Sequence, residues 1–273
     1  MTRLRAPWIL AMLILAACSV PASPSAEPTT AVPAISGARS ETGPELLVPD
    51  PRPRASQPAM TARFGVALAP DHCVDRDLPT PTTSDPALAV LDRSYALPMD
   101  AVPPDLVPAS AAGLEGPSGS MPVREVLVGD LAAMRAAWQA ARLTIEIESA
   151  YRSYADQAAT FDAWAARIGH DGALVRTARP GHSEHQLGTA LDVVSPGWSG
   201  RFGDWAVESA EGAWMAEHAW EYGFVMSYPT DGMAETCYGY EPWHYRWIGR
   251  EAAAAHRDSG LRLRPFLERY VDA

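Results

Sequence analysis

The chain has 273 residues, which is enough for one sizeable domain or two small ones. Its 47% hydrophobic and 20% charged residues are typical of a globular protein. The formal net charge of -11 argues against nucleic acid or an anionic membrane surface as a partner. The sequence contains no lysine, so its strong cations are all arginines.

The N-terminus has the features of an export signal. Arg3 and Arg5 form a positive region, and residues 7–17 form an apolar run that is short for a membrane span. The run ends in Leu-Ala-Ala directly before Cys18, which resembles the lipobox of bacterial lipoproteins. This pattern predicts an exported protein whose one membrane attachment is a lipid on Cys18.

The export signal and the amino-acid composition divide the chain into three parts. Residues 1–17 are predicted to be a signal peptide, although an ordinary secretory signal cut after Ala17 or Ala22 is the alternative. Residues 18–62 are rich in Pro, Ala, Ser and Thr and are predicted to be a solvated tether. Residues 63–273 are predicted to form the folded domain, with a loop-rich N-terminal wrap and a compact core from about residue 123.

Apolar periodicity predicts alternating helices and strands in the compact core. Apolar residues recur at helical spacing in residues 126–141, 154–168, 213–222 and 250–258. A glycine follows the end of several of these segments, as is typical of helix C-termini. Strands are predicted at 143–148, 189–194, 224–228 and 238–247. Because these elements lack the regular rhythm of parallel βαβ units, the fold class is predicted to be α+β.

Two short segments supply the side chains of a metal site. The first offers His185 and, seven positions later, Asp192; the second offers His244 with Glu241 three positions before it. Two histidines and one aspartate leave one zinc coordination position open, as hydrolysis requires. Glu241 then remains free to act as a general base. The combination predicts a zinc hydrolase.

The backbone of both segments has to be irregular. Gly188, between His185 and Asp192, would allow a tight turn that lets their side chains converge. On a regular strand Glu241 and His244 would point to opposite faces. We therefore expect Pro242 to distort the strand, or Glu241 to reach over the metal from the start of the strand.

The sequence resembles the M15 family of zinc D-alanyl-D-alanine carboxypeptidases, in the VanY-type branch. The pattern S-x-H-x-x-G-x-A-x-D is matched at residues 183–192, and E-x-W-H at 241–244. A third pattern, S-x-Y-R-S with a glutamine downstream, is matched at 149–153 and Gln157. The blocks occur in order within residues 91–248, and the likeness does not extend to the tether. It implies a small antiparallel sheet flanked by helices.

The resemblance also implies a role for each residue of the matched patterns. The Zn2+ ligands would be His185, Asp192 and His244, and the general base would be Glu241. Arg152 would neutralise the oxyanion that forms when water attacks the peptide carbonyl, because developing charge needs a fixed cation or donor.

Three further residues are expected to contact the substrate. By the resemblance, Ser183 and Gln157 would hold the C-terminal carboxylate of the substrate. Trp243 would form a wall of the pocket, although a place in the core is an equally good interpretation for a tryptophan. His182 falls outside the family pattern and is expected at the rim.

The implied function is that of a D,D-carboxypeptidase, acting as a monomer on peptidoglycan stem peptides. An L,D-carboxypeptidase or a wall endopeptidase of the same fold is the alternative within the class. The alternative from another class is a non-catalytic wall-binding module that contains structural zinc. The presence of both Glu241 and Arg152 favours the enzyme.

Export also changes the expectation for the cysteines. In an oxidising compartment the two thiols other than Cys18, which belong to Cys73 and Cys237, are expected to form a disulfide. A cysteine metal ligand is the alternative. It is disfavoured because no second cysteine stands at ligand spacing.

Overall fold

A computed structural model of the protein describes residues 73–83, 85–116 and 119–271. The predicted signal peptide, the tether and residues 63–72 of the wrap lie outside the described residues. Among the helices that are described, none has both the length and the apolar character needed to cross a membrane.

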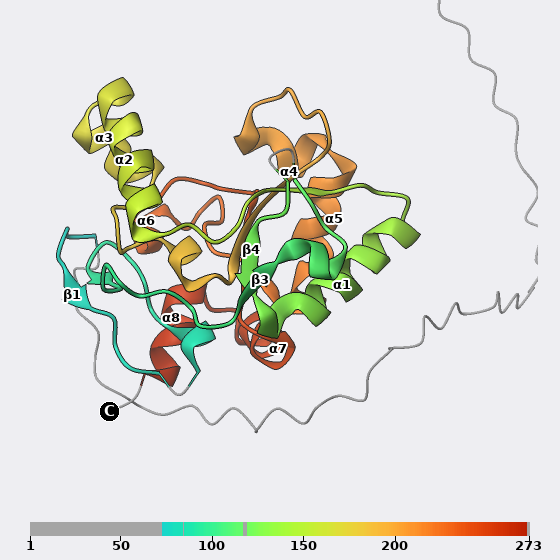
Figure 1. The fold of residues 1–273 in the computed structure, drawn as a ribbon, viewed down its shortest axis with the longest axis horizontal. Helices are drawn as coiled ribbons and strands as arrows, with labels where there is room; N and C mark the ends of the chain where they lie inside the picture. The colour runs from blue at the N-terminus through green and yellow to red at the C-terminus, as the bar shows by residue number, and fades with distance from the viewer. Residues whose placement is uncertain (1–72, 84, 117–118, 272–273) are drawn as a thin grey trace, which may run out of the picture. The chain divides into compact units, whose positions relative to one another are not determined.

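A four-stranded antiparallel sheet lies at the centre of the domain (Figure 1). Its strands, in spatial order, are β5 (Glu146–Ser149), β6 (Ala190–Val194), β8 (His244–Trp247) and β7 (Phe224–Met226). All three pairings are antiparallel. The predicted α+β class with a small antiparallel sheet is therefore confirmed.

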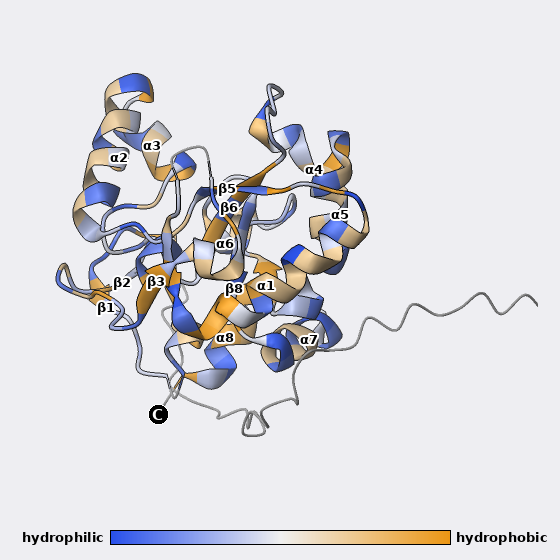
Figure 2. Ribbon diagram, turned by 45° about the vertical axis from the view of Figure 1, so that its right-hand side comes forward, coloured by the Kyte–Doolittle hydropathy of each residue, from blue (hydrophilic) through white to orange (hydrophobic). Residues whose placement is uncertain are grey.

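One face of this sheet packs on helix α1 (Glu125–Ala140). The buried residues of α1 recur at spacings of three and four, and they are Leu127, Leu131, Met134 and Trp138. They join alternate strand residues, including Leu191, Val193, Tyr245 and Trp247, in the main core. Figure 2 shows hydrophobic ribbon where the strands and α1 meet. Because strand side chains alternate between faces, the intervening residues Asp192, His244 and Arg246 point to the opposite face.

Helices α2 (Tyr154–Ile168) and α3 (His170–Arg176) form a hairpin. The turn between them is made by Gly169, whose φ of 81° is a conformation that favours glycine. The hairpin has a small apolar cluster of its own, centred on Phe161, Ala173 and Leu174. In Figure 1 it stands on one side of the domain, opposite the segment that contains α4 (Trp205–Glu208).

The C-terminal part builds a second apolar cluster. Helix α5 (Ala210–His218) continues as a 3-10 turn, η5 (Ala219–Tyr222), before β7. After the short α6 (Met233–Thr236) and strand β8 come α7 (Arg250–Ser259), α8 (Leu263–Leu267) and the 3-10 turn η6 (Glu268–Tyr270). Side chains of α7 and α8 pack there against Leu88, Val90 and Val225.

The described residues before α1 are mostly loop, with short paired strands. Strand β1 (Leu78–Pro79) pairs in parallel with β2 (Tyr95–Ala96), and β3 (Leu106–Pro108) pairs with β4 (Pro122–Arg124) in the antiparallel sense. Two 3-10 turns, η1 (Pro86–Leu88) and η2 (Ala109–Ala112), interrupt the loops. Ala87, Ala109 and Leu114 are buried in the main core, so this region is part of the packed domain.

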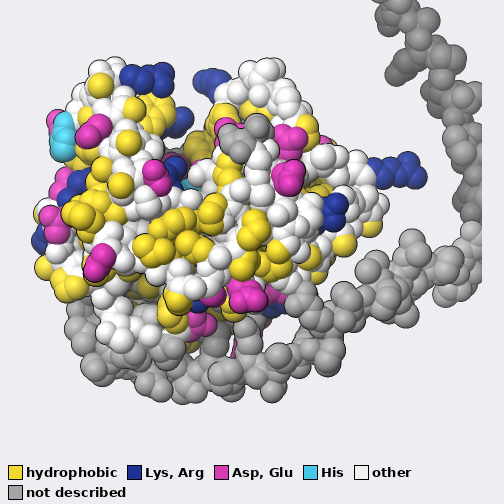
Figure 3. Space-filling view, in the orientation of Figure 1, with side chains coloured by type: hydrophobic (Ala, Val, Ile, Leu, Met, Phe, Trp, Pro, Cys, Tyr) yellow, Lys and Arg dark blue, Asp and Glu magenta, His cyan; other side chains and the backbone are white. Residues whose placement is uncertain are grey.

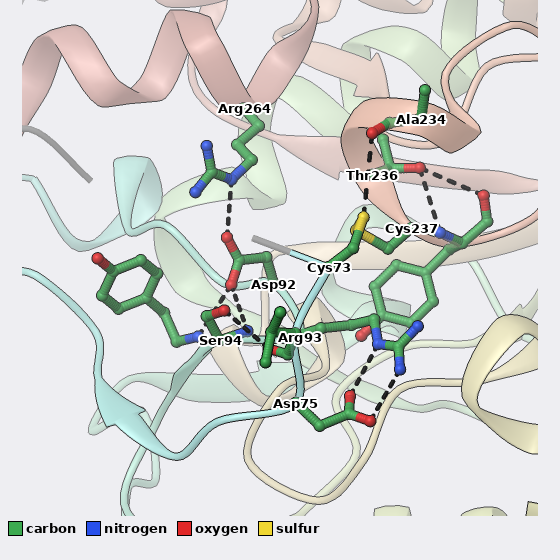
Figure 4. The surroundings of a disulfide bond; sticks show 12 residues. Cys73, Asp75, Asp92, Arg93, Ser94, Ala234, Thr236, Cys237 and Arg264 are labelled. Atoms are coloured by element: carbon green, nitrogen blue, oxygen red, sulfur yellow. Dashed lines mark hydrogen bonds and ion pairs between the residues drawn. A yellow bond between two sulfur atoms is a disulfide. The ribbon is translucent and has the colours of Figure 1, made fainter. Parts of the chain in front are cut away.

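The predicted disulfide between Cys73 and Cys237 is confirmed, with Cα atoms 5.4 Å apart and a sequence separation of 164. Cys237 follows α6 in the left-handed conformation (φ 67°). Figure 4 shows that the bridge lies beside two ion pairs, Arg93 with Asp75 and Arg264 with Asp92. The bridge and the Arg264–Asp92 pair attach the start of the described chain to its C-terminal half, and the Arg93–Asp75 pair holds two N-terminal loops together.

Several predicted boundaries are wrong for local reasons. The strand predicted at 238–247 begins only at His244, because residues 241–244 form a turn. The strand predicted at 143–148 begins at Glu146, and the helix predicted at 213–222 begins at Ala210. Helices α3 and α8 were not predicted, since at seven and five residues they are too short for periodicity to reveal.

Candidate active site

The first motif is a 3-10 turn that leads into a strand. The turn η3 (Glu184–Leu187) ends at Gly188, whose φ of 70° lies in the left-handed region, and β6 follows two residues later. Gly188 thus makes the tight turn that its place in the motif predicts. His185 on the turn and Asp192 on the strand then approach each other, with Nε2 of His185 3.1 Å from Oδ2 of Asp192.

The second histidine reaches the same point through strand pairing. Asp192 and His244 are directly opposite each other in the β6–β8 register. Their side chains lie on the same face of the sheet, with Nδ1 of His244 3.0 Å from Oδ1 of Asp192. One ligand-type atom from each of His185, Asp192 and His244 lies within 4.8 Å of the other two.

Hydrogen bonds on the far side of each ring fix which nitrogen faces Asp192. Nδ1–H of His185 donates to the carbonyl oxygen of Ala150 over 2.6 Å, because a carbonyl can only accept. Nε2–H of His244 donates to the carboxylate of Glu184 over 2.9 Å. The nitrogens that face Asp192 are thus Nε2 of His185 and Nδ1 of His244. Carbonyls and carboxylates that orient metal-binding histidines in this way are a general feature of metal sites.

The three residues fit a divalent cation. When both of these ring nitrogens are deprotonated, two imidazole lone pairs and a carboxylate in mutual contact repel one another unless a positive charge lies between them. Zn–N and Zn–O bonds of about 2.0–2.2 Å in a tetrahedral arrangement separate ligand atoms by roughly 3.3 Å. The closest approaches of 3.0 and 3.1 Å are near that separation.

The pKa values of the same groups reflect how strongly the buried side chains interact with one another. Burial opposes the charged form, but hydrogen bonds to Asp192 and Glu184 raise the pKa of His244 to about 10. The pKa of the Asp192 carboxyl is lowered despite its burial, because both histidines stabilise the carboxylate. Burial lowers the pKa of His185, which favours its neutral imidazole.

Glu241 enters the site from a turn and not from a strand. The N–H of His244 donates to the carbonyl of Glu241 over 3.1 Å, which closes a turn with Pro242 at its second position, where proline is favoured. This turn resolves the difficulty posed by the three-residue spacing, because Glu241 is not held to strand alternation. Burial raises the pKa of the Glu241 carboxyl to about 7, with Asp192 adding to the rise and His244 opposing it.

Glu184 and Arg246 form a buried ion pair behind His244. Nη1 of Arg246 donates to Oε1 of Glu184 over 2.9 Å, and Ser227 donates to Oε2 over 2.6 Å. Arg246 also donates to the carbonyls of Ala87 and Ala89. Arg246 and His244 hold the pKa of the Glu184 carboxyl at about 2 although burial opposes ionisation. The motifs did not indicate this pair, although both residues stand within or next to the matched segments.

The predicted substrate-contacting residues lie around the same cleft. Nε of Arg152 donates to Oε1 of Gln157 over 2.6 Å, and Nε2 of Gln157 donates to the carbonyl of Ala178. Ser183 is buried beside His185. Trp243 is 9% exposed and belongs to the main core while also lining the cleft, so both interpretations of this residue apply.

The cleft is a cavity of about 240 Å³. Of the eight predicted site residues, seven line it directly: Arg152, Ser183, His185, Asp192, Glu241, Trp243 and His244. Gln157 is fully buried behind Arg152 and positions that side chain. The cavity is also lined by residues that the motifs did not indicate, among them Trp164, Arg176, Phe202, Tyr228 and Tyr238. These come from the α2–α3 hairpin and from loops, and no local pattern indicates that they converge.

The expectation that His182 lies at the rim is wrong. Its side chain is buried, its Nδ1–H donates to the carbonyl of Asp92 over 2.7 Å, and its Nε2 lies 3.1 Å from Asp77. His182 therefore connects the first motif to the N-terminal loops and faces away from the cleft.

Comparison with known proteins agrees with the geometry. The VanY family, described as D-alanyl-D-alanine carboxypeptidase, matches residues 121–250. A putative carboxypeptidase of Bacillus subtilis (strain 168), YodJ, is 33% identical over 183 residues, which cover 67% of each chain. A D-alanyl-D-alanine carboxypeptidase of Enterococcus faecium is 33% identical over 46% of this chain, and the match spans 36% of the enterococcal protein.

Solved structures show the same fold. The LdcB LD-carboxypeptidase superimposes with a TM-score of 0.61 at 31% identity, covering 70% of this chain and 90% of LdcB. A vancomycin-resistance D,D-pentapeptidase, a mutant of VanY in complex with Zn(II), superimposes with a TM-score of 0.55 at 26% identity. That match covers 67% of this chain and 99% of the VanY chain. With the YodJ relationship and the VanY match over the segments that contain His185, Asp192 and His244, this chain belongs to the VanY family of D-alanyl-D-alanine carboxypeptidases.

Proposed function

We propose that the protein is a zinc-dependent D,D-carboxypeptidase that hydrolyses the terminal D-Ala peptide bond of peptidoglycan stem peptides. The observation that carries this proposal is the convergence of His185, Asp192 and His244 at one end of a cleft that also holds Glu241. A purely structural zinc site would use four protein ligands. These three leave a coordination position for the reaction.

His185, Asp192 and His244 would hold the zinc ion. When bound, zinc lowers the pKa of the attacking water and polarises the scissile carbonyl. The carboxylate of Glu241 takes the proton from that water and passes it to the nitrogen of the leaving D-Ala. Its pKa of about 7 suits a group that must both accept and release a proton near neutral pH.

Arg152 would stabilise the negative charge that develops on the carbonyl oxygen. The hydrogen bond from its Nε to Gln157 fixes the guanidinium in the cleft, so little reorganisation is needed during the reaction. Ser183 and Arg152, the latter positioned by Gln157, would together receive the C-terminal carboxylate of the substrate. Trp243 would form part of the wall of the cleft.

An L,D-carboxypeptidase is the second candidate, because the LdcB LD-carboxypeptidase superimposes over 90% of its length. The two activities differ in the peptide that is cut. Purified zinc-loaded protein should release D-Ala from a pentapeptide stem faster than from a tetrapeptide stem, with the products identified by mass. Preferential cleavage of the tetrapeptide would establish the L,D activity, and cleavage of neither peptide would contradict both candidates.

The location of the enzyme is proposed from its N-terminal segment. Its positive and apolar regions, followed by Cys18, support export and anchoring to the outer side of a bacterial membrane by a lipid. Replacing Cys18 by Ala should move the protein from the membrane fraction to the soluble exported fraction. The monomeric state is proposed as well, and sedimentation of the exported domain would test it.

A further inference from the structure

Arg176 places a second cation in the catalytic cleft. It stands in the last turn of α3 and lines the same cavity as Glu241 and His244. Its guanidinium carbon lies 5.3 Å from the ring centroid of Trp164 and 5.7 Å from that of Trp243. Both distances fall within the range of cation–π attraction, so the two rings define the position of this charge.

The contacts of Arg176 differ from those of its neighbour Arg179. Arg179 donates to Asp77 and to the carbonyls of Arg76 and Arg93, which ties it to the N-terminal loops. Over the described ranges 73–83, 85–116 and 119–271, no hydrogen bond or ion pair joins Arg176 to a carboxylate. Its charge nevertheless acts on the site, because it helps to lower the pKa of Glu241 against the effect of burial.

The space-filling view shows where such a charge could meet a ligand. In Figure 3 a hollow lies between the α2–α3 hairpin and the segment that contains α4, and arginine side chains stand on both sides of it. Trp164, Phe202 and Trp243 line the cavity. Aromatic walls exclude water and strengthen an ion pair formed beside them. The planar guanidinium can also bind a carboxylate through two parallel hydrogen bonds.

The chemistry of the reaction limits which carboxylate this can be. This step rests on the proposed function. The residue released by a D,D-carboxypeptidase carries one carboxylate, which is assigned above to Ser183 and Arg152. Any other carboxylate of the substrate therefore lies on the N-terminal side of the scissile bond. We propose that Arg176 binds such a carboxylate, so that the enzyme selects stem peptides whose acidic groups are free over those in which they are amidated.

The test uses pairs of pentapeptide stems that differ in one group. In each pair a single carboxylate N-terminal to the scissile bond is either free or replaced by a carboxamide. For one of the pairs, wild-type enzyme should cleave the peptide with the free carboxylate with a kcat/KM roughly tenfold higher than that for its amidated partner. The difference should lie mainly in KM, because the charge-assisted contact is already made in the ground state. Arg176→Gln should abolish this preference, measured as the ratio of kcat/KM between the two members of each pair.

Arg167 provides a matched control. Its guanidinium carbon lies 4.8 Å from the ring centroid of Trp164, but it is not among the residues that line the cleft. Arg167→Gln removes the same charge from the same helical hairpin and should leave the preference intact. Calorimetry on Glu241→Gln, with and without Arg176→Gln, should show the same loss of discrimination in binding alone.

The outcomes separate this inference from the proposed function. The inference would be overturned if the wild type cleaved both members of every pair equally, or if the preference persisted in Arg176→Gln. Either result would leave the carboxypeptidase activity in place. An equal loss of kcat/KM on both members in Arg176→Gln would also overturn it, because Arg176 would then serve the terminal carboxylate. Failure of the zinc-loaded wild type to cut any of the peptides would contradict the proposed function itself.

Discussion

Oδ1 of Asp192 lies 3.0 Å from Nδ1 of His244 because the two residues are directly opposite each other in the β6–β8 strand pair. Leu191 and Tyr245, one position along the same pair, point to the other face and pack in the core. A slip of one residue in this register would turn the side chains of Asp192 and His244 away from the cleft. The apolar core on one face of the sheet thus maintains the polar site on the other.

His185→Ala should remove zinc and activity together. The variant loses one of three proposed ligands, and no other described histidine, cysteine or carboxylate completes a three-residue metal set at this position. Zinc content after dialysis against a weak chelator, measured beside the release of D-Ala, checks this expectation. Tight stoichiometric zinc in His185→Ala would show that the ligands are wrongly assigned.

Glu184→Gln should weaken zinc binding without touching the metal. Glu184 accepts the hydrogen bond from Nε2 of His244, and loss of such an orienting partner costs about 10–100-fold in metal affinity or activity. Ser227→Ala, which removes one hydrogen bond to the same carboxylate but keeps its charge, should cost less. Competition with a chromogenic chelator gives both affinities.

The same Glu184→Gln change should also destabilise the fold. It leaves Arg246 buried without its anionic partner, and breaking a buried ion pair costs on the order of 3–5 kcal/mol in the free energy of unfolding. Melting of the metal-free proteins separates this effect from the zinc affinity. An unchanged melting temperature would contradict the assignment of a structural role to the ion pair.

Arg152 should affect turnover more than folding. Arg152→Ala is expected to lower kcat by roughly two to three orders of magnitude, since an oxyanion donor acts mainly on the transition state. KM should rise as well if the guanidinium also contacts the substrate carboxylate. Arg152→Lys keeps the charge but loses the planar fork, so it should recover only part of the activity. Unchanged kcat/KM in Arg152→Ala, with normal zinc content, would remove Arg152 from the mechanism.

The Cys73–Cys237 disulfide should contribute strongly to stability. It closes a loop of 164 positions, and the chain-entropy account predicts a loss of about 3–5 kcal/mol when both cysteines become serine. For a domain of this size the loss corresponds to roughly 6–20 °C in Tm. Calorimetric melting of the double variant measures the change, and a shift below about 2 °C would contradict the prediction.

Much of the site could be predicted because its residues lie in short local patterns. His185, Gly188 and Asp192 occur within eight positions, and glycine is the residue that accepts the left-handed turn between them. Helix α2 also has the bounds that its periodicity and Gly169 predict. In these cases the information that fixes the structure is local.

Contacts between distant segments could not be predicted. The place of His182 directly before the motif suggests an accessible side chain, yet the backbone carbonyl of Asp92, ninety positions earlier, accepts its hydrogen bond and keeps it buried. Glu241 fits a strand pattern in the sequence, because the turn that closes at His244 depends on a hydrogen bond and not on an apolar pattern. Arg176 has no motif around it, since its place in the cleft depends on how the α2–α3 hairpin packs beside Trp243.

The mechanism depends most directly on Glu241 acting as a base that is not a metal ligand. The decisive measurement is the zinc content of Glu241→Gln together with its rate of D-Ala release from a pentapeptide stem, each compared with the wild type. The structure predicts one zinc ion per chain in both proteins, because His185, Asp192 and His244 are unchanged. It predicts a rate lower by about a hundred- to ten-thousand-fold in the variant, the usual cost of losing a general base. A Glu241→Gln variant that keeps the wild-type rate with its zinc in place would contradict the mechanism.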